Sequence, residues 1–264
     1  MSDRPLILVS NDDGIDAKGI RALAAAVSDL GDVVVVAPLE EQSAVGHAIT
    51  MRTPVRLRSW PFEAADGSGP DIRAFAVTGT PADCVKIAVD KLLDRRPDLV
   101  VSGVNHGANT AVNVLYSGTV SAATEGSVLG IPSIAFSLCA NGPDLDFRDS
   151  TAVARQISRK VLSVGLAPGI LLNVNIPAVA RGQLQGAMVT RQARARWEEE
   201  FVERRDPFDE LYYWLSGRFV ELDNGANTDL WAISNGFVSI TPIDHDLTAH
   251  EQLERLDGLR WLDA

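Results

Sequence analysis

The sequence predicts an α/β protein whose sheet is mostly parallel and is covered by helices on both faces. Short runs of β-branched and other apolar residues recur along the first two-thirds of the chain, and several are continuous rather than alternating. Continuous apolar runs are typical of strands that are buried on both faces. Segments with apolar residues at helical spacing separate these runs. A chain of 264 residues is also long enough for one domain of this class.

Strands and helices alternate from the start of the chain to about Val174. Leu6–Ser10 is the first predicted strand, Ala17–Leu30 the first helix and Val33–Ala37 the second strand. The remaining predicted strands are Pro54–Leu57, Arg73–Val77, Leu99–Ser102, Ser133–Ser137 and Ile170–Val174, and the remaining helices are Pro81–Leu93, Gly118–Leu129 and Asp149–Val164. This order predicts a three-layer α/β/α architecture with a doubly wound, Rossmann-like sheet.

The chain changes character after Pro177. Arg191–Arg205 is highly charged, Leu211–Val220 is rich in aromatic residues, and Val238–Pro242 is followed by a polar C-terminal stretch. A charged run is usually a solvated face, and an extended arm that packs on a partner subunit is the alternative interpretation. We predict a catalytic core in residues 1–177 and an extension of the same domain, with a C-terminal arm for oligomerisation, in residues 178–264.

Composition restricts the partners of the protein. The formal net charge of -11 disfavours binding to a nucleic-acid polymer or to an anionic membrane surface. The chain has neither a long apolar run nor a leader-like start, so we expect a cytoplasmic protein without membrane contact. Cys84 and Cys139 lack CxxC spacing, and we expect both to be small buried apolar residues rather than a disulfide or thiolate site.

Polar side chains follow three predicted strands, where ligands of open α/β sheets bind. Asp12 and Asp13 follow the first strand, Ser43 lies in the loop after the second, and Asn105 follows Leu99–Ser102. Two carboxylates about 4 Å apart repel each other by about 4 kcal/mol at an effective dielectric constant near 20, and a divalent cation reverses that sign. Such an all-oxygen set favours Mg²⁺ or Mn²⁺. The alternative is that Asp12 and Asp13 only cap the following helix.

The segment Ser117-Gly118-Thr119 opens directly into a predicted helix. Free backbone N–H groups at a helix N-terminus can hold a phosphate, although a plain N-cap is the alternative role of Ser117. The chain lacks the GxGxxG, GxxxxGK[ST] and GxSxG motifs. The chain has four histidines, His47, His106, His245 and His250, and they form no HExxH pair. We expect most of the four to be surface or structural residues.

Several motifs occur along the chain in an order that is typical of one known family. They are Asn11-Asp12-Asp13-Gly14, the loop from Pro38 to Ser43, the segment from Val77 to Val85, the segment from Ser102 to Gly126, and Thr241-Pro242 with the later Asp246-Leu247-Thr248. In this pattern, which covers essentially the whole chain, the sequence resembles the SurE-type 5'/3'-nucleotidases, the stationary-phase survival proteins. Members of that family hydrolyse nucleoside monophosphates and, in some cases, short polyphosphate.

The resemblance implies specific roles for residues of this chain. One Mg²⁺ or Mn²⁺ per subunit would be held by Asp12, Asp13, Ser43 and Asn105. The phosphate pocket would be lined by Asn109, Ser117, Gly118 and Thr119. The resemblance further implies a homodimer or homotetramer with exchanged C-terminal segments, in which Asp246 and His250 approach the active site and join Asp12, Asp13 and Asn109 in catalysis.

The sequence departs from the family pattern at two places that bear on substrate preference. Ala44 stands where a glycine commonly follows the metal-loop serine, and Thr110–Asn113 replaces a polar, often acidic stretch.

The expected mechanism is in-line attack by a metal-oriented water, with His250 protonating the leaving oxygen. A covalent route through Asp12 is disfavoured because the chain lacks Asp-x-Asp spacing at this position. Two competing functions are a non-catalytic, metal-dependent nucleotide-binding role in a stress response and a dinucleotide-dependent oxidoreductase. The oxidoreductase would need a glycine fingerprint that the chain lacks.

Overall fold

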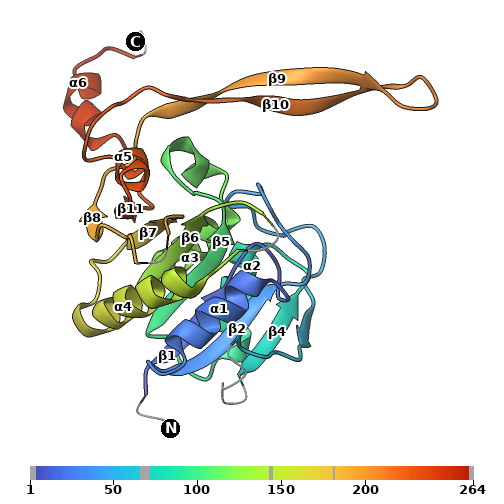
Figure 1. The fold of residues 1–264 in the computed structure, drawn as a ribbon, viewed down its shortest axis with the longest axis vertical. Helices are drawn as coiled ribbons and strands as arrows, with labels where there is room; N and C mark the ends of the chain where they lie inside the picture. Colours follow the sequence, from blue (N-terminus) through green and yellow to red (C-terminus); the bar gives the residue numbers. More distant parts are fainter. Residues whose placement is uncertain (1–3, 66–71, 143–144, 181, 262–264) are drawn as a thin grey trace.

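The computed structural model describes residues 4–65, 72–142, 145–180 and 182–261, which form an α/β body and a projecting arm (Figure 1). In these ranges, nine strands form one sheet in the order β3-β4-β2-β1-β5-β6-β7-β11-β8. Their bounds are β1 Leu6–Ser10, β2 Asp32–Pro38, β3 Leu57–Ser59, β4 Arg73–Val77, β5 Leu99–His106, β6 Ser133–Cys139, β7 Ile170–Pro177, β8 Ala187–Val189 and β11 Val238–Asp244. The chain order reverses at β1, which lies between β2 and β5, so the sheet is doubly wound as predicted.

Six neighbouring strands, from β4 to β7, run parallel to one another, and β3 and β11 are added antiparallel at the two sides. Strands β1 and β2 are buried along nearly their whole length, as the continuous apolar runs predict. The predicted class, an α/β fold with a mostly parallel sheet, is therefore confirmed. All carboxyl ends of the parallel strands lie at one edge of the sheet, and the polar residues that follow the strands share that edge.

Helices cover both faces of the sheet. The helices α1 Lys18–Val27 and α4 Arg148–Val164 contact each other on one face, and α2 Pro81–Ile87 and α3 Gly118–Val128 do so on the other. Each pair closes its own apolar core against the sheet. Burying these two cores is the main favourable term that holds the three layers together.

Some predicted boundaries differ from the structure. The strand predicted over Pro54–Leu57 lies instead at Leu57–Ser59, where it pairs antiparallel with β4, because Pro54 cannot donate a backbone hydrogen bond. The helix predicted over Pro81–Leu93 is α-helical only to Ile87 and continues as a π-helical turn over Ala88–Leu92. Cys84 is fully buried as expected, whereas Cys139 at the end of β6 is only partly buried.

The region after Pro177 contributes both to the sheet and to the arm. Strands β8 and β11 extend the sheet beyond β7, and the short helix α5 Asp229–Ser234 precedes β11. The strands β9 Ala195–Arg205 and β10 Leu211–Glu221 form an antiparallel two-stranded ribbon that projects far from the body (Figure 1). After β11 come a 3₁₀ turn, His250–Gln252, and the helix α6 Leu253–Asp257.

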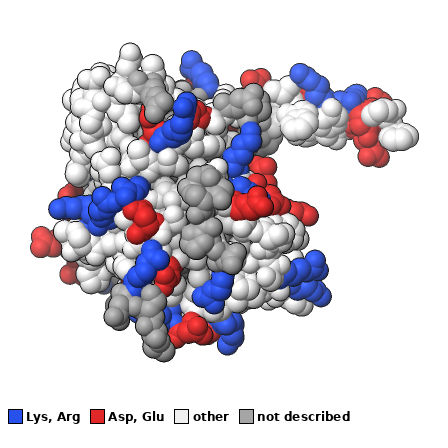
Figure 2. Space-filling model, turned by 60° about the horizontal axis from the view of Figure 1, so that its bottom comes forward, with Lys and Arg blue, Asp and Glu red and all other residues white. Residues whose placement is uncertain are grey.

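Charged groups of both signs occur on the face of the molecule that Figure 2 shows. On the face that Figure 2 shows, Lys and Arg side chains alternate with Asp and Glu side chains, and the arm carries both signs toward its far end. Among the helices in the described ranges, none combines the length and apolar character that crossing a bilayer requires.

Candidate active site

The loop after β1 carries two adjacent carboxylates and is held in place by the loop after β2. Gly14, at φ +96, turns the chain back, and its carbonyl oxygen accepts a 2.8 Å hydrogen bond from the side-chain amide of Asn11. The backbone N–H of Gln42 donates to the carbonyl oxygen of Asp12 at 2.7 Å. These contacts join the ends of β1 and β2, where the sequence predicted polar residues.

Asp12 lies against the N-terminus of α3. The hydroxyl of Thr119 donates a hydrogen bond to Oδ1 of Asp12, and Asp12 is only 5% exposed. A Cβ atom on Gly118 would lie 2.6 Å from Cβ of Asp12, so only glycine allows this approach. Two segments that lie far apart in the sequence therefore meet in one contact. This contact places a carboxylate beside a helix N-terminus, and the backbone N–H of Thr119 bonds the carboxylate there.

The alternative role of the acidic pair as a helix cap does not hold. The N-cap of α1 is Ala17, and no side chain caps that helix. The alternative role of Ser117 does hold, because its Oγ accepts a 3.0 Å hydrogen bond from the backbone N–H of Val120. Ser117 therefore fixes the start of α3, and accepting this bond leaves its hydroxyl able to donate a hydrogen bond as well.

Asp13 pairs with a histidine from another strand. Nδ1 of His106 lies 3.0 Å from Oδ1 of Asp13, and the Asp13 side chain is 7% exposed. Sequence reasoning did not select His106; the one available signal was its position next to Asn105. The pairing of β5 with β6 shifts register between Ser102 and Asn105, and such irregularities re-aim side chains at strand ends.

The pKa values of the two carboxyls are raised, because their burial outweighs the effect of the nearby His106. Burial raises the pKa of Asp12, and burial together with the charge of Asp12 raises the pKa of Asp13 to about 6. The nearby His106 only partly offsets these effects. Within the described ranges, no three His, Cys, Asp or Glu side chains are grouped to hold a metal ion. A cation at this point would therefore use the two carboxylates together with neutral oxygen ligands, which suits Mg²⁺ or Mn²⁺ and not zinc.

The two neutral ligand candidates differ in their positions. The amide nitrogen of Asn105 donates to the carbonyl oxygen of Gly107 at 2.9 Å, and its amide oxygen accepts no hydrogen bond from the described residues. The hydroxyl of Ser43 is exposed and donates to Glu41 at 2.6 Å, so it has no hydrogen bond to Asp12 or Asp13 in the described chain. Asn105 fits a ligand role as it stands. Ser43 shares a loop with Gln42, which is bonded to Asp12.

Asn109 is buried in a network of amide and hydroxyl groups. Its side-chain nitrogen donates to Oγ of Ser137 at 2.8 Å, and its backbone N–H donates to Oδ1 of Asn175 at 2.8 Å. The side-chain nitrogen of Asn173 donates to the carbonyl oxygen of Asn109 at 2.7 Å. These contacts from β6 and β7 hold the segment between Asn105 and α3 rigidly. Asn173 and Asn175 were not selected from the sequence, because only the sheet order brings them under Asn109.

Asp246 and His250 lie after β11 and contact each other. Nε2 of His250 lies 2.8 Å from Oδ2 of Asp246, and both side chains are exposed. Hydrogen bonds from Thr248, followed by the bond from His250, lower the pKa of Asp246 to about 2. Within the described residues of one chain, neither side chain forms a hydrogen bond or ion pair with Asp12 or Asp13.

The loop over residues 42–50 is bonded to α2 and α3 by partly buried polar contacts that sequence reasoning missed. Glu125 of α3 is 3% exposed and lies 3.0 Å from Nε2 of His47 and 2.7 Å from Nζ of Lys86. Burial opposes ionisation of Glu125, but the bonds from His47 and Lys86 outweigh it and lower the pKa of this carboxyl. Asp83 of α2 accepts from the backbone N–H of Thr50 at 3.1 Å. The loop that carries Ser43 is thereby anchored on the two helices.

The fold and this edge of the sheet define a class of protein: a doubly wound α/β protein with an oxygen-rich acidic site beside a helix N-terminus. The chain belongs to the Survival protein SurE family, which it matches over residues 7–199. The protein named "5'-nucleotidase SurE" of Cytophaga hutchinsonii is 52% identical over 255 residues, covering 96% of this chain and 96% of that protein. "5'-nucleotidase SurE 1" of Thermus thermophilus is 52% identical over 253 residues, covering 96% and 97%.

A solved structure of a relative has the same fold. The crystal structure of the SurE protein from Aquifex aeolicus matches with a TM-score of 0.80 at 38% sequence identity. The match covers 96% of this chain and 98% of that one. The similarity therefore includes the sheet, both helical layers and most of the region after Pro177.

Proposed function

We propose that the protein is a divalent-metal-dependent phosphomonoesterase that hydrolyses nucleoside monophosphates to a nucleoside and phosphate. The observation that carries this proposal is the buried pair Asp12 and Asp13, placed at the carboxyl edge of the sheet against the N-terminus of α3. A candidate site for a cation would thus lie beside a candidate site for an anion. The relatives named 5'-nucleotidase support the choice of nucleotides as substrates.

The residues at this edge fit a hard divalent cation. Asp12, Asp13 and the amide oxygen of Asn105 would hold it, with Ser43 as a fourth ligand from the neighbouring loop. Because burial raises the pKa of both carboxyls, a nearby positive charge would favour their ionised forms. When bound, such an ion polarises a phosphoryl oxygen and orients the attacking water.

The chain itself supplies the anion site. The backbone N–H groups of Gly118 and Thr119 stand at the first turn of α3, where they have no partner within the helix, and that of Thr119 is directed at the Asp12 carboxylate. The hydroxyl of Ser117 is positioned by its cap bond, and Asn109 is fixed nearby by β6 and β7. Together these groups would hold the phosphate and stabilise its charge in the transition state.

The arm supports a homodimer or homotetramer with exchanged C-terminal segments. An isolated two-stranded ribbon is at best marginally stable in water. One face of the ribbon carries a row of exposed apolar side chains, and a second copy of the chain would bury them: Trp197, Phe201, Leu211, Tyr213 and Leu215. In such an assembly Asp246 and His250 of another subunit could reach the site, and His250 would protonate the leaving oxygen. Short polyphosphate is a second substrate class for the same site.

Phosphate release from a panel of nucleoside monophosphates tests the proposal. We expect turnover with added Mg²⁺ or Mn²⁺, loss of turnover with EDTA, and recovery when the metal is restored. Asp12→Asn should lower kcat at least roughly 100-fold, because it removes one charge from the cation site. Asp90→Asn, at an exposed aspartate that pairs with Lys91, is the matched control. No turnover with any metal, or unchanged turnover in Asp12→Asn, would contradict the proposal.

A further inference from the structure

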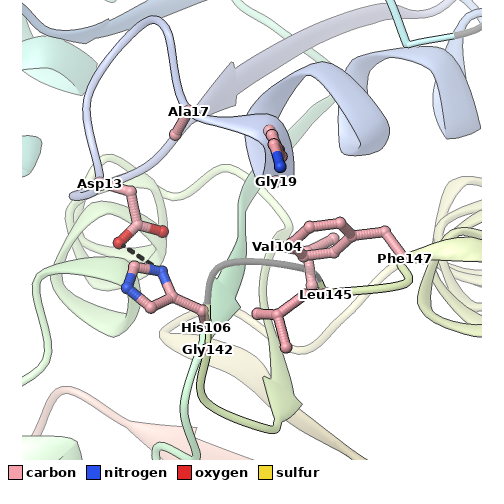
Figure 3. A pocket seen from close by; sticks show the side chains of 9 residues that line it. Asp13, Ala17, Gly19, Val104, His106, Gly142, Leu145 and Phe147 are labelled. Atoms are coloured by element: carbon pink, nitrogen blue, oxygen red, sulfur yellow. Dashed lines mark ion pairs between the residues drawn. The ribbon is translucent and has the colours of Figure 1, made fainter.

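A cavity of about 190 Å³ opens beside Asp13 on the side of α1 and α4 (Figure 3). It lies between the start of α1, the end of β5, and Gly142, Leu145 and Phe147. The side chains that matter for its chemistry are those of Asp13, Lys18, Val104, His106, Leu145 and Phe147. The cavity is therefore continuous with the candidate active site through Asp13, and Thr119 is not part of its lining.

The cavity has a polar end and an apolar wall. At the polar end Asp13 and His106 face each other at 3.0 Å. On the other side, Figure 3 shows the ring of Phe147 and the side chains of Leu145 and Val104 grouped together. Val104 is 1% exposed, and Leu145 and Phe147 pack against the core, so the wall is rigid.

The position of the cavity indicates which part of a substrate it would take. A phosphate beside Asp12, Asp13 and the N-terminus of α3 would leave its ester substituent to extend past Asp13. The cavity is smaller than the roughly 300–1,000 Å³ typical of pockets that enclose a whole ligand, so it suits one moiety. An apolar wall with one aromatic ring suits a flat heterocycle.

A shallower groove adjoins this cavity and widens the space. It has a volume of about 600 Å³, lies between α1 and α4, and shares Lys18 and Phe147 with the cavity. Its floor includes Ala22 and Ala26 of α1. A base that stacked on Phe147 would therefore have room on its far side for purine-sized rings.

We propose that this cavity binds the nucleobase of the substrate, with Phe147 as the stacking residue. This inference rests on the proposed function, because it assigns the part of the substrate that does not react. Base–aromatic stacking tolerates different bases. The cavity would therefore favour nucleotides over phosphomonoesters that lack a base, and it would discriminate only weakly between one base and another. Phe147 is then a residue that determines substrate class.

Steady-state kinetics of the full-length protein with AMP and with ribose 5-phosphate, which has no base, test this inference. Phe147→Ala should raise KM for AMP roughly tenfold, the effect of losing one stacked ring, and leave kcat little changed. The KM for ribose 5-phosphate should stay the same. Phe147→Tyr should restore the KM for AMP, and Phe147→Leu, which keeps most of the apolar volume, should raise it even if the alanine variant fails to fold.

Phe75→Ala is the matched control, because Phe75 is a partly buried aromatic residue that packs on the other core. It should change neither KM. Unchanged KM values in both Phe147→Ala and Phe147→Leu, or equal increases for AMP and ribose 5-phosphate, would overturn the base-site inference. If the unaltered protein hydrolyses neither compound with any metal, the proposed function fails instead, so the two failures are distinguishable.

Discussion

The position of the Asp12 carboxylate depends on individual atoms of the neighbouring residues. The hydroxyl of Thr119 and the missing side chain of Gly118 let α3 approach the carboxylate directly. On the other side, the backbone of Gln42 is bonded to the Asp12 carbonyl oxygen. The carboxylate therefore has little freedom to move, which is the condition for a pre-organised site.

Gly118→Ala is expected to damage the site with little effect on the rest of the fold. The added methyl group would lie 2.6 Å from Cβ of Asp12, so the loop or the helix must move. A displacement of about 1 Å costs roughly 100-fold in rate, and we expect kcat/KM for nucleoside monophosphates to fall by about that factor. The measurement is steady-state kinetics, with circular dichroism to show that the fold is retained.

Gly258→Ala is the control for this substitution, since a Cβ at that position meets no atom closer than 3.9 Å. Activity of Gly118→Ala within a few-fold of the unaltered protein would show that the contact between α3 and Asp12 does not matter for turnover.

At the level of secondary-structure elements, α2 and α3 act as anchors for the loop after β2. Thr80 and Asp83 at the start of α2 form a capping box, and both also bond the loop, through the carbonyl oxygen of Ala48 and the N–H of Thr50. Glu125 of α3 adds the bond to His47. One loop is thus bonded to both helices of that face, and the helices in turn pack on each other.

Glu125→Gln should destabilise the protein in a pH-dependent way. The folded-state pKa of Glu125 is lowered, so its ionised form stabilises the fold above about pH 4, the pKa range of an unfolded glutamate. That contribution is lost as the pH falls through the folded-state pKa. At pH 7 we expect a loss of about 1–3 kcal/mol in the free energy of unfolding, because Glu125 is buried but its partner Lys86 is half exposed.

Urea unfolding of both proteins at pH 7 and near pH 3 measures this difference. The loss in Glu125→Gln should shrink at the lower pH, because the stabilisation by the ionised carboxyl decreases as the pH falls below the pKa of an unfolded glutamate. Glu254→Gln, at an exposed position on α6, serves as the control. An equal loss at the two pH values would show that the charge of Glu125 does not stabilise the fold.

In the molecule as a whole, the arm projects away from the described body along most of its length (Figure 1). In β9 and β10, side chains at paired positions point to the same face, and Phe201 pairs with Leu215. These two side chains are 65% and 60% exposed. Exposed apolar side chains concentrated on one element mark a surface that binds another protein.

Phe201→Glu with Leu215→Glu should dissociate the expected dimer or tetramer. Two carboxylates would have to be buried without partners in the interface, which strongly disfavours association. We expect a smaller molar mass by light scattering after size exclusion, together with lower nucleotidase activity if His250 acts in another subunit.

The control is Glu200→Gln at a position whose side chain faces the other side of the ribbon, paired with Ser216. An unchanged molar mass of the double variant would show that this face of the arm does not hold subunits together. Unchanged activity in a dissociated protein would remove His250 from the proposed mechanism.

Several features of the site were predictable from local patterns alone. The acidic pair, Asn105 and the turn at Ser117 all follow or precede an element that periodicity predicts, so their approximate place at one edge of the sheet follows from strand direction. The strand at Leu57–Ser59 was misplaced by a few residues. Its position depends on pairing with β4, which a single run of residues does not encode.

The layers of the fold follow from local sequence, because burial on one or both faces of an element sets the spacing of its apolar residues. The local sequence also shows that the site is lined by oxygen-bearing side chains. Which distant residues touch is set by tertiary packing: His106 with Asp13, Thr119 with Asp12, and Glu125 with His47. Packing also brings Phe147 to the cavity that Asp13 lines. Such contacts arise from strand order and helix packing, and these depend on many residues at once rather than on the spacing within any motif.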